Sequence, residues 1–420
     1  MLTESGILSS SCTSRAGSQE FAIPPLADFV LRLGGREFLP LILGGMGVNI
    51  SVPELALAVA NAGGIGHLSD AGALSVSDLR YGTSFVRRRF QQNRHFVGST
   101  EKAGLLFDLE SVREATFRLV RDAMSRKRLG AIFLNVMEKL TMGSPRETLR
   151  ARLHAAMDAE VDGITLGAGL HLGSLALMQE HPRFSETLVG IIVSSARALK
   201  LFLIRAAKVG RMPDYIVVEG PLAGGHLGFP EQWQDFDLRT ILREVRQCLD
   251  GVAGTIPVIA AGGIFTGADG VAMLREGAAG IQVATRFAVA RESGLPDHVK
   301  QAFFAANAED VVVNTISATG YPMRMLRQSP AIGSTLPPQC ESLGYALDGD
   351  GHCSYLDAHA SGSTEKTCLC AHMRNYTIWT CGHTVSRLKE TVHRLPDGTY
   401  EQPTAAEVLR EYLTGAAPAG

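Results

Sequence analysis

The sequence predicts a TIM (β/α)8 barrel that is followed by a smaller, cysteine-rich C-terminal extension. Eight apolar runs of strand length fall within roughly 250 residues, and helical patterns separate nearly all of them. Glycines gather directly after several of these runs, where the loops of such a barrel carry its functional residues. A doubly wound open sheet is the alternative, but its nucleotide loop normally reads G-x-G-x-x-G after the first strand, and the first run here ends in GGMGVN.

The predicted elements divide the chain into three parts. Residues 1–30 begin with a polar segment rich in small side chains, which predicts a flexible tail; the barrel occupies 31–330 and the extension 331–420. Apolar and β-branched runs predict strands at 38–43, 65–68, 131–137, 163–167, 188–193, 216–218, 256–260 and 280–284. Helical periodicity predicts helices at 53–62, 145–159, 172–180, 196–209, 238–248, 267–276 and 404–413.

Two local signals refine this scheme between the first and third strands. Ser51 is the expected N-cap of the first helix, and Gly63 is its expected stop. Arg87, Arg88 and Arg89 follow the second strand and predict a solvated helix face in preference to a phosphate site.

Composition and charge exclude several classes of function. The net charge of −2 and the pI of about 6.6 predict no basic face, so neither nucleic acid nor an anionic membrane is an expected partner. The N-terminus lacks the basic start and apolar run of a signal peptide, and no later window approaches the length of a membrane span. We therefore expect a cytoplasmic protein, and the sequence specifies no oligomeric state.

The most informative stretch is DYIVVEGPLAGGHLGF at 214–229, in which a buried strand ends in a loop of small residues. Ala223, Gly224 and Gly225 remove side-chain bulk over three consecutive positions, so the backbone can approach a flat ligand closely. His226 is the titratable group of this loop, and an imidazole can exchange a proton or bond to an anion near neutral pH. The adjacent glycines favour a catalytic His226, because a tight turn alone needs only one glycine.

Similar glycine-rich breaks follow other strands, and on a barrel they meet at one rim. They occur at 44–47, 167–169, 220–225 and 262–263, and they predict a site for a large flat ligand. Gly262 and Gly263 follow the seventh strand, and Ala284 and Thr285 follow the eighth. Barrels often bind a phosphate at these two loops through backbone N–H groups, and Thr285 adds a hydroxyl donor.

Four motifs in this order, LPLILGGMG, VVEGPLAGGHLG, VIAAGGI and GIQVATRF, resemble the nitronate monooxygenase family, also called 2-nitropropane dioxygenases. The resemblance covers about residues 38–330. It implies a TIM barrel that binds FMN and oxidises alkyl nitronates, or nitroalkanes, with dioxygen to a carbonyl compound and nitrite. In the implied site, Asn135 meets the pyrimidine side of the flavin, the backbone of Gly45 and Met46 passes its ring, Gly263, Ala284 and Thr285 hold the phosphate, and His226 faces the substrate beside Gly225. Gly224 and Gly262 complete the expected cofactor-binding set, and Gly320 and Arg324 are implied to border the flavin.

Three positions depart from the family pattern. Leu222 stands where glutamate is often found, Ala284 stands where glycine is usual, and the segment 193–197 lacks the lysine that many members place near the flavin. FMN-dependent enoyl-thioester reductases share the AGGH loop and the barrel, so hydride transfer from a nicotinamide to an acyl thioester is the alternative reaction. A flavin-binding or regulatory barrel without catalysis is the third hypothesis.

The extension is rich in potential soft ligands for a metal. They occur together within 352–383, at His352, Cys353, Cys368, Cys370, His372, Cys381 and His383. Their spacing matches no familiar metal motif, so we assign no metal site, and bound metal, reduced buried thiols and a redox switch stay open as alternatives.

Overall fold

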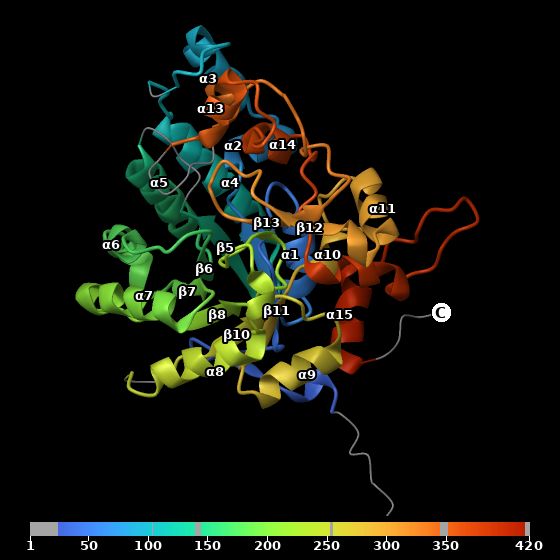
Figure 1. Cartoon of the computed structure of the whole chain (residues 1–420). Coiled ribbons are helices and arrows are strands. Elements are labelled where there is room, and N and C mark those ends of the chain that lie inside the picture. The colour runs from blue at the N-terminus through green and yellow to red at the C-terminus, as the bar shows by residue number, and fades with distance from the viewer. Residues whose placement is uncertain (1–23, 103, 139–143, 253–254, 345–351, 416–420) are drawn as a thin grey trace, which may run out of the picture.

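The computed structural model describes residues 24–102, 104–138, 144–252, 255–344 and 352–415. Eight parallel strands close into a barrel in the order β10, β11, β3, β4, β5, β6, β7, β8, with helices packed around them (Figure 1). These strands are β3 (Leu41–Leu43), β4 (Ile65–Ser69), β5 (Ala131–Met137), β6 (Gly163–Gly167), β7 (Leu188–Val193), β8 (Tyr215–Glu219), β10 (Val258–Ala261) and β11 (Gly280–Val283). Each overlaps its predicted range, and the predicted TIM barrel is confirmed.

The other elements surround or extend the barrel. The α-helices are α1 (Pro53–Ala60), α2 (Ala73–Tyr81), α3 (Phe85–Asn93), α4 (Leu109–Arg126), α5 (Pro145–Asp158), α6 (Ser174–Gln179), α7 (Ala196–Val209), α8 (Leu238–Leu249), α9 (Gly267–Arg275), α10 (Thr285–Ala288), α11 (Asp297–Ala305), α12 (Cys340–Leu343), α13 (Ser354–Ala360), α14 (Leu369–Arg374) and α15 (Ala405–Thr414). Short 3-10 helices are η1 (Leu26–Asp28), η2 (Arg94–Phe96), η3 (Pro182–Ser185), η4 (Trp233–Asp235), η5 (Ala308–Asp310) and η6 (His383–Thr391). The strands outside the barrel are β1 (Leu31–Leu33), β2 (Arg36–Phe38), β9 (Gly225–His226), β12 (Val311–Asn314) and β13 (Met323–Leu326).

Strand alternation sorts the core into an inner and an outer layer. Side chains on one face of each strand fill the barrel interior, among them Ile42, Phe133, Tyr215, Val217 and Ile259. The opposite faces pack against the surrounding helices in the main hydrophobic cluster. The interior is thus packed with side chains, and the loops after the strands are left to form a ligand site.

The sequence did not predict the hairpin beside the N-terminal ends of the barrel strands. β1 and β2 pair antiparallel and add Leu31, Leu33 and Phe38 to the inner cluster. The strand expected at 38–43 is therefore divided, because Pro40 separates β2 from β3 and has no N–H to donate to a ladder. Residues that we expected in the flexible tail also belong to the fold, since Leu26 is buried against the outer core.

Ser51 does not cap the first helix as expected. The N-cap of α1 is Val52, which makes no side-chain bond to the helix. The Ser51 hydroxyl instead donates to Gly44 O at 2.8 Å and accepts from Met46 N at 2.9 Å. The hydroxyl is therefore committed to the glycine loop after β3, which it holds in place.

The arginine stretch lies on α3, and only part of it is solvated. Arg87 and Arg88 are exposed, but Arg89 is buried. The Arg89 guanidinium lies over the Phe107 ring at 3.7 Å and donates to Leu106 O at 3.2 Å. Arg89 is thus a structural residue, and the expectation of a fully solvated face is wrong for this position. The long helix α4, which follows, was also not predicted.

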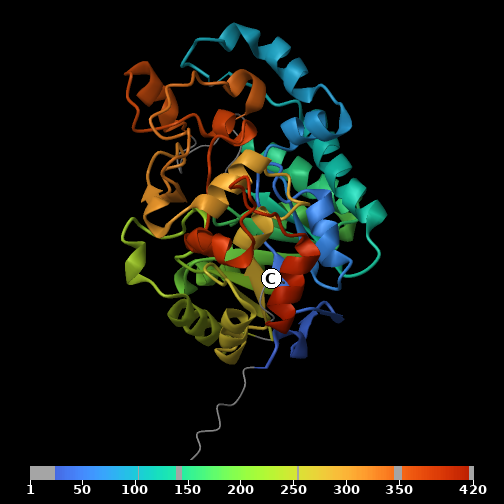
Figure 2. The ribbon, with the colours of Figure 1, turned by 90° about the vertical axis from the view of Figure 1, so that its right-hand side faces the viewer.

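The chain after the barrel packs back onto it. β12, β13 and β9 form a three-stranded antiparallel sheet, so this part of the chain pairs with the loop that carries His226. The predicted C-terminal helix is confirmed as α15, which Thr404 caps and which packs against α1 and α9 (Figures 1 and 2). Within the described residues, no helix combines the length and apolar character that a membrane crossing needs.

Candidate functional site

The structure gathers the residues predicted to bind a cofactor at the ends and loops of the barrel strands. They are Gly45, Met46, Asn135, Gly224, Gly225, Gly262, Gly263, Ala284 and Thr285. Close approaches connect neighbouring loops: a Cβ on Gly44 would lie 3.0 Å from the Ala284 Cβ, and a Cβ on Gly262 would lie 2.9 Å from Gly220 O. The loops therefore form one continuous rim, although the binding role of each residue stays a prediction.

The glycine loop after β3 lies against the end of β5. A Cβ added to Gly45 would lie 2.4 Å from the Cβ of Asn135, so only glycine fits there. Asn135 Nδ2 donates to Gly45 O at 3.0 Å, whereas the buried Asn135 Oδ1 accepts no hydrogen bond from any described residue. Gln282 Oε1, on β11, is likewise buried and unpaired within the described residues. Buried amide oxygens are normally paired, so these two atoms mark a place for donors that a ligand would supply.

The loops 262–264 and 284–285, which we call the phosphate rim, offer donors without acceptors. In the described part of the chain, no acceptor is bonded to the backbone N–H of Gly263, Ile264 or Thr285, or to the Thr285 hydroxyl. Gly263 has a φ of +86°, and a Cβ there would lie 2.8 Å from the side chain of the leucine in the β8 loop. A cluster of free backbone donors is suited to an anion.

His226 lies on β9, where the ladder to β13 places it opposite Met323. Its Nε2 is 2.7 Å from Ser317 Oγ, and Ser317 Oγ is 2.8 Å from Thr319 Oγ1. Burial lowers the pKa of His226 to about 4. The imidazole is therefore uncharged at neutral pH, and its Nδ1 has no partner among the described residues.

Arg324 supports the loop that leads to His226. Its side chain is fully buried, and Nη1 donates to Pro221 O at 2.6 Å and to Ala223 O. The guanidinium lies over the Trp233 ring at 4.3 Å. Burial lowers the pKa of Arg324 to about 10, so it stays charged at neutral pH, and Nε and Nη2 have no partner in the described residues.

Glu219 is a potential acid or base that the sequence analysis did not single out. It ends β8 on the same face as Tyr215 and Val217, which fill the barrel interior. Within the described residues its carboxyl has no hydrogen bond or ion pair, and burial raises its pKa to about 7. The sequence did contain a signal for Glu219. Side chains alternate along a strand, so Glu219 must point to the same side as Val217, two residues earlier.

The buried cysteines of the extension are divided between two apolar clusters. Cys353 and Cys368 lie in one apolar cluster, whereas Cys381 lies in another. The His372 ring nitrogens lie within hydrogen-bond distance of Thr377 Oγ1 and Ser334 Oγ. The described residues contain no group of three or more side chains placed to hold a metal ion.

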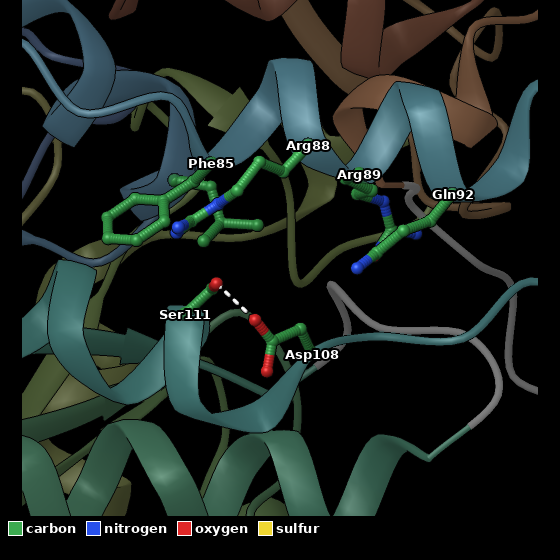
Figure 3. A pocket seen from close by; sticks show the side chains of 7 residues that line it. Phe85, Arg88, Arg89, Gln92, Asp108 and Ser111 are labelled. Carbon is green, nitrogen blue, oxygen red and sulfur yellow. Dashed lines mark hydrogen bonds between the residues drawn. The ribbon is translucent and has the colours of Figure 1, made fainter.

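A small hollow between α3 and the start of α4 lies apart from the barrel rim (Figure 3). It is lined by Leu74, Phe85, Arg88, Arg89, Gln92, Asp108 and Ser111. Arg88 lies over the Phe85 ring at 5.0 Å, and the Ser111 hydroxyl donates to Asp108 Oδ2. Because both arginines lie over aromatic rings and Ser111 is bonded to Asp108, we do not take this hollow as the functional site.

Comparison with known proteins agrees with the motifs. The family model for nitronate monooxygenase matches residues 37–345. A nitronate monooxygenase from Pseudomonas aeruginosa is 28% identical over 324 residues, which cover 74% of this chain and 84% of the relative. A (3aS,4S,5R,7aS)-5-hydroxy-7a-methyl-1-oxo-octahydro-1H-indene-4-carboxyl-CoA dehydrogenase from Mycobacterium tuberculosis is 39% identical over 165 residues, 38% of this chain and 42% of the relative.

A solved structure extends the comparison to the fold. FabK from Thermotoga maritima superimposes with a TM-score of 0.53 at 20% identity, over 89% of this chain and 91% of its own. This likeness concerns the fold alone, and the match to the mycobacterial dehydrogenase spans less than two thirds of that enzyme. The family match, in contrast, spans most of the present chain. The chain therefore belongs to the nitronate monooxygenase family of flavin-dependent oxidoreductases.

Proposed function

We propose that this protein is an FMN-dependent nitronate monooxygenase, which oxidises alkyl nitronates with dioxygen to a carbonyl compound and nitrite. One observation carries the proposal: an uncharged His226 with a free Nδ1 lies in the loop after β8, beside strand ends and loops that carry unpaired buried groups. Family membership supplies the reaction class, since the matching family is that of nitronate monooxygenases.

The unpaired groups fit the two ends of FMN. Asn135 Oδ1 can accept from an N–H on the pyrimidine side of the flavin, and the phosphate rim can donate to its phosphate. The residues that we expect to hold the cofactor are those of the sequence prediction: Gly45, Met46, Asn135, Gly224, Gly225, Gly262, Gly263, Ala284 and Thr285. When bound, FMN supplies the redox chemistry that connects substrate oxidation to dioxygen.

His226 would act as the base for substrates that still carry their carbon proton. Thr319 N donates to Ser317 Oγ at 3.2 Å, and His226 Nε2 lies 2.7 Å from the same oxygen. The tautomer in which His226 Nε2 donates to Ser317 Oγ carries the lone pair on Nδ1, and this is the tautomer that the proposed reaction uses. A proton taken at Nδ1 from a nitroalkane would leave an imidazolium that stabilises the nitronate anion beside it.

A flavin reaction on an acyl thioester is the second candidate, and one observation favours it. The mycobacterial relative, 39% identical over the matched 165 residues, is named as a dehydrogenase of a carboxyl-CoA compound. Enoyl-thioester reduction with a nicotinamide belongs to the same class of substrate. A barrel that binds flavin without catalysis is the third possibility that the test must separate.

Anaerobic reduction of the flavin separates these candidates. We expect an alkyl nitronate, such as propyl-2-nitronate, to bleach the visible flavin absorbance, and expect air to restore it with release of nitrite. We expect NADH and NADPH to leave the spectrum unchanged. Rapid bleaching by either nicotinamide followed by turnover of crotonyl-CoA would overturn the proposal in favour of the thioester reaction. Flavin that no substrate reduces would favour the non-catalytic barrel.

A further inference from the structure

A segment of the C-terminal extension, Cys381 to His383, lies on the loops that form the phosphate rim. A Cβ added to Gly382 would lie 2.4 Å from Thr285 Oγ1, and a Cβ added to Gly224 would lie 2.6 Å from Gly382 N. The backbone N–H of His383 donates to Leu222 O at 3.0 Å. The segment thus contacts the loops after β8 and β11 at the same place, and it lies outside the residues 37–345 that the family model matches.

Main-chain bonds and apolar packing fix this segment. Thr380 forms an antiparallel bridge with Met325, and Cys381 N donates to Arg324 O at 3.3 Å. The side chain of Cys381 is buried in an apolar cluster. The ring of His383 packs against Trp233 at 5.6 Å between centroids. The position of Gly382 is therefore set from both sides.

Backbone donors without an acceptor and a positive charge without a counter-ion lie near this segment, within the described residues. The N–H of Gly382 reaches no acceptor in the described part of the chain, as is true of the N–H of Gly263 and of Thr285. The backbone carbonyl of Arg324 accepts from Cys381 N, so Arg324 lies next to this segment. Its side chain is fully buried, and Nε and Nη2 have no hydrogen-bond partner among the described residues. A buried guanidinium without an anion is costly, so an anionic ligand near it would be stabilised.

We propose that Gly382 and the guanidinium of Arg324 complete the site for the 5′-phosphate of FMN, so that the extension closes the phosphate rim. The N–H of Gly382 would add a donor to those of the rim, and Arg324 would supply the positive charge beneath the loop. This inference rests on the proposed cofactor and goes beyond it, because it assigns part of the phosphate site to a segment outside the family match.

The test compares FMN with riboflavin, which lacks only the phosphate. Apoprotein is titrated with each flavin, and quenching of flavin fluorescence gives the two dissociation constants. Gly382→Ala places a methyl group against Thr285 Oγ1, so we expect it to weaken FMN binding about tenfold or more and to leave riboflavin binding unchanged. Gly251→Ala is the matched control, because Gly251 lies in an exposed turn with nothing within 4 Å of an added Cβ.

A second pair of variants tests the contact itself. Thr285→Ala removes the atom that the new methyl group would meet, so adding Gly382→Ala to it should cost less FMN affinity than Gly382→Ala costs alone. Arg324→Met should weaken FMN more than riboflavin if the charge serves the phosphate. Equal weakening of both flavins would show that Arg324 only positions the loop through Pro221 O and Ala223 O, and would overturn its part in the proposal.

The outcome is independent of the proposed reaction. Unchanged FMN affinity in Gly382→Ala, or an equal loss for FMN and riboflavin, would overturn the phosphate role of the extension. A protein that discriminates FMN from riboflavin as described but oxidises no nitronate would support the phosphate site and contradict the proposed reaction. Inorganic phosphate gives an independent readout, since it should stabilise the apoprotein against heat and should lose this effect in Gly382→Ala.

Discussion

Replacement of His226 by asparagine tests what the imidazole does. Asparagine retains a hydrogen-bond donor of similar reach but cannot take a proton from carbon. Burial lowers the pKa of His226 to about 4, so the imidazole is uncharged at pH 7 and can take a proton. The β9 ladder to β13 holds the loop through main-chain atoms, so we expect the variant to keep its FMN.

The magnitude of the loss depends on the form of the substrate. Removal of a general base costs about two to four powers of ten in rate. Removal of one hydrogen bond to an anion costs roughly a factor of ten to a hundred. We therefore expect His226→Asn to lose about 10²- to 10⁴-fold on a neutral nitroalkane and much less on the preformed nitronate, whose proton is already gone.

The assay measures oxygen consumption with the neutral and the preformed substrate on the same enzyme preparation. Ser317→Ala is the matched control, because it removes the partner of Nε2 at 2.7 Å and leaves the imidazole in place. Its loss on the nitroalkane should be smaller than that of His226→Asn. Equal losses on both substrate forms in His226→Asn would refute the reasoning that His226 is the base.

Two further predictions concern titration and stability. Glu219→Gln should stabilise the protein above pH 7 and not at pH 4. The pKa of Glu219 is raised to about 7 in the folded protein, so its ionisation lowers the folding stability as the pH rises from 4.5 through 7. Melting temperatures of the variant and the parent protein at the two pH values check this, and an equal shift at both would contradict it. Burial lowers the pKa of His67 and of His171 from 6.5 to about 4, so each should withdraw about 3 kcal/mol of stability as the pH falls from 6.5 to 4. At pH 5.5 these two histidines and His226 should each take up about one proton on unfolding, and Glu219 should release about one, so these four groups give a net uptake of about two protons. Calorimetry in buffers of different ionisation enthalpy measures the net uptake, and a value below one proton would contradict the prediction.

The parts of the fold that were predictable depend on local sequence. The barrel strands are short β-branched runs that a parallel sheet buries on both faces, and their rhythm with the helices predicts the closed barrel. β1 and β2 are only three residues each, too short for alternation to be seen. The helix α4 could have been predicted, although we did not predict it. Asp108 is a typical N-cap, and the apolar residues Val112, Ala115 and Leu119 recur at helical spacing.

The candidate site was predictable where glycine carried the signal. Gly45 and Gly263 stand out in the sequence as glycines after strands, and the structure gives the reason: a side chain on Gly45 would meet Asn135 on β5, and one on Gly263 would meet the loop after β8. Ser317, by contrast, reaches His226 across 91 residues of chain, and Arg324 reaches Ala223 across 101. Nothing in a single sequence specifies such partners, since the barrel and the sheet of β9, β12 and β13 bring them together. The approach of Gly382 to the phosphate rim was hidden for the same reason.

The flavin content of the purified protein tests the central claim most directly. If the unpaired Asn135 Oδ1 and the free donors of the phosphate rim belong to a cofactor site, the protein should bind about one equivalent of FMN per chain without a covalent bond. Absorbance of the folded protein, followed by mass analysis of the flavin released on denaturation, measures both quantities. One equivalent of released FMN is the predicted result. A folded, colourless protein that takes up no FMN on titration would contradict the account.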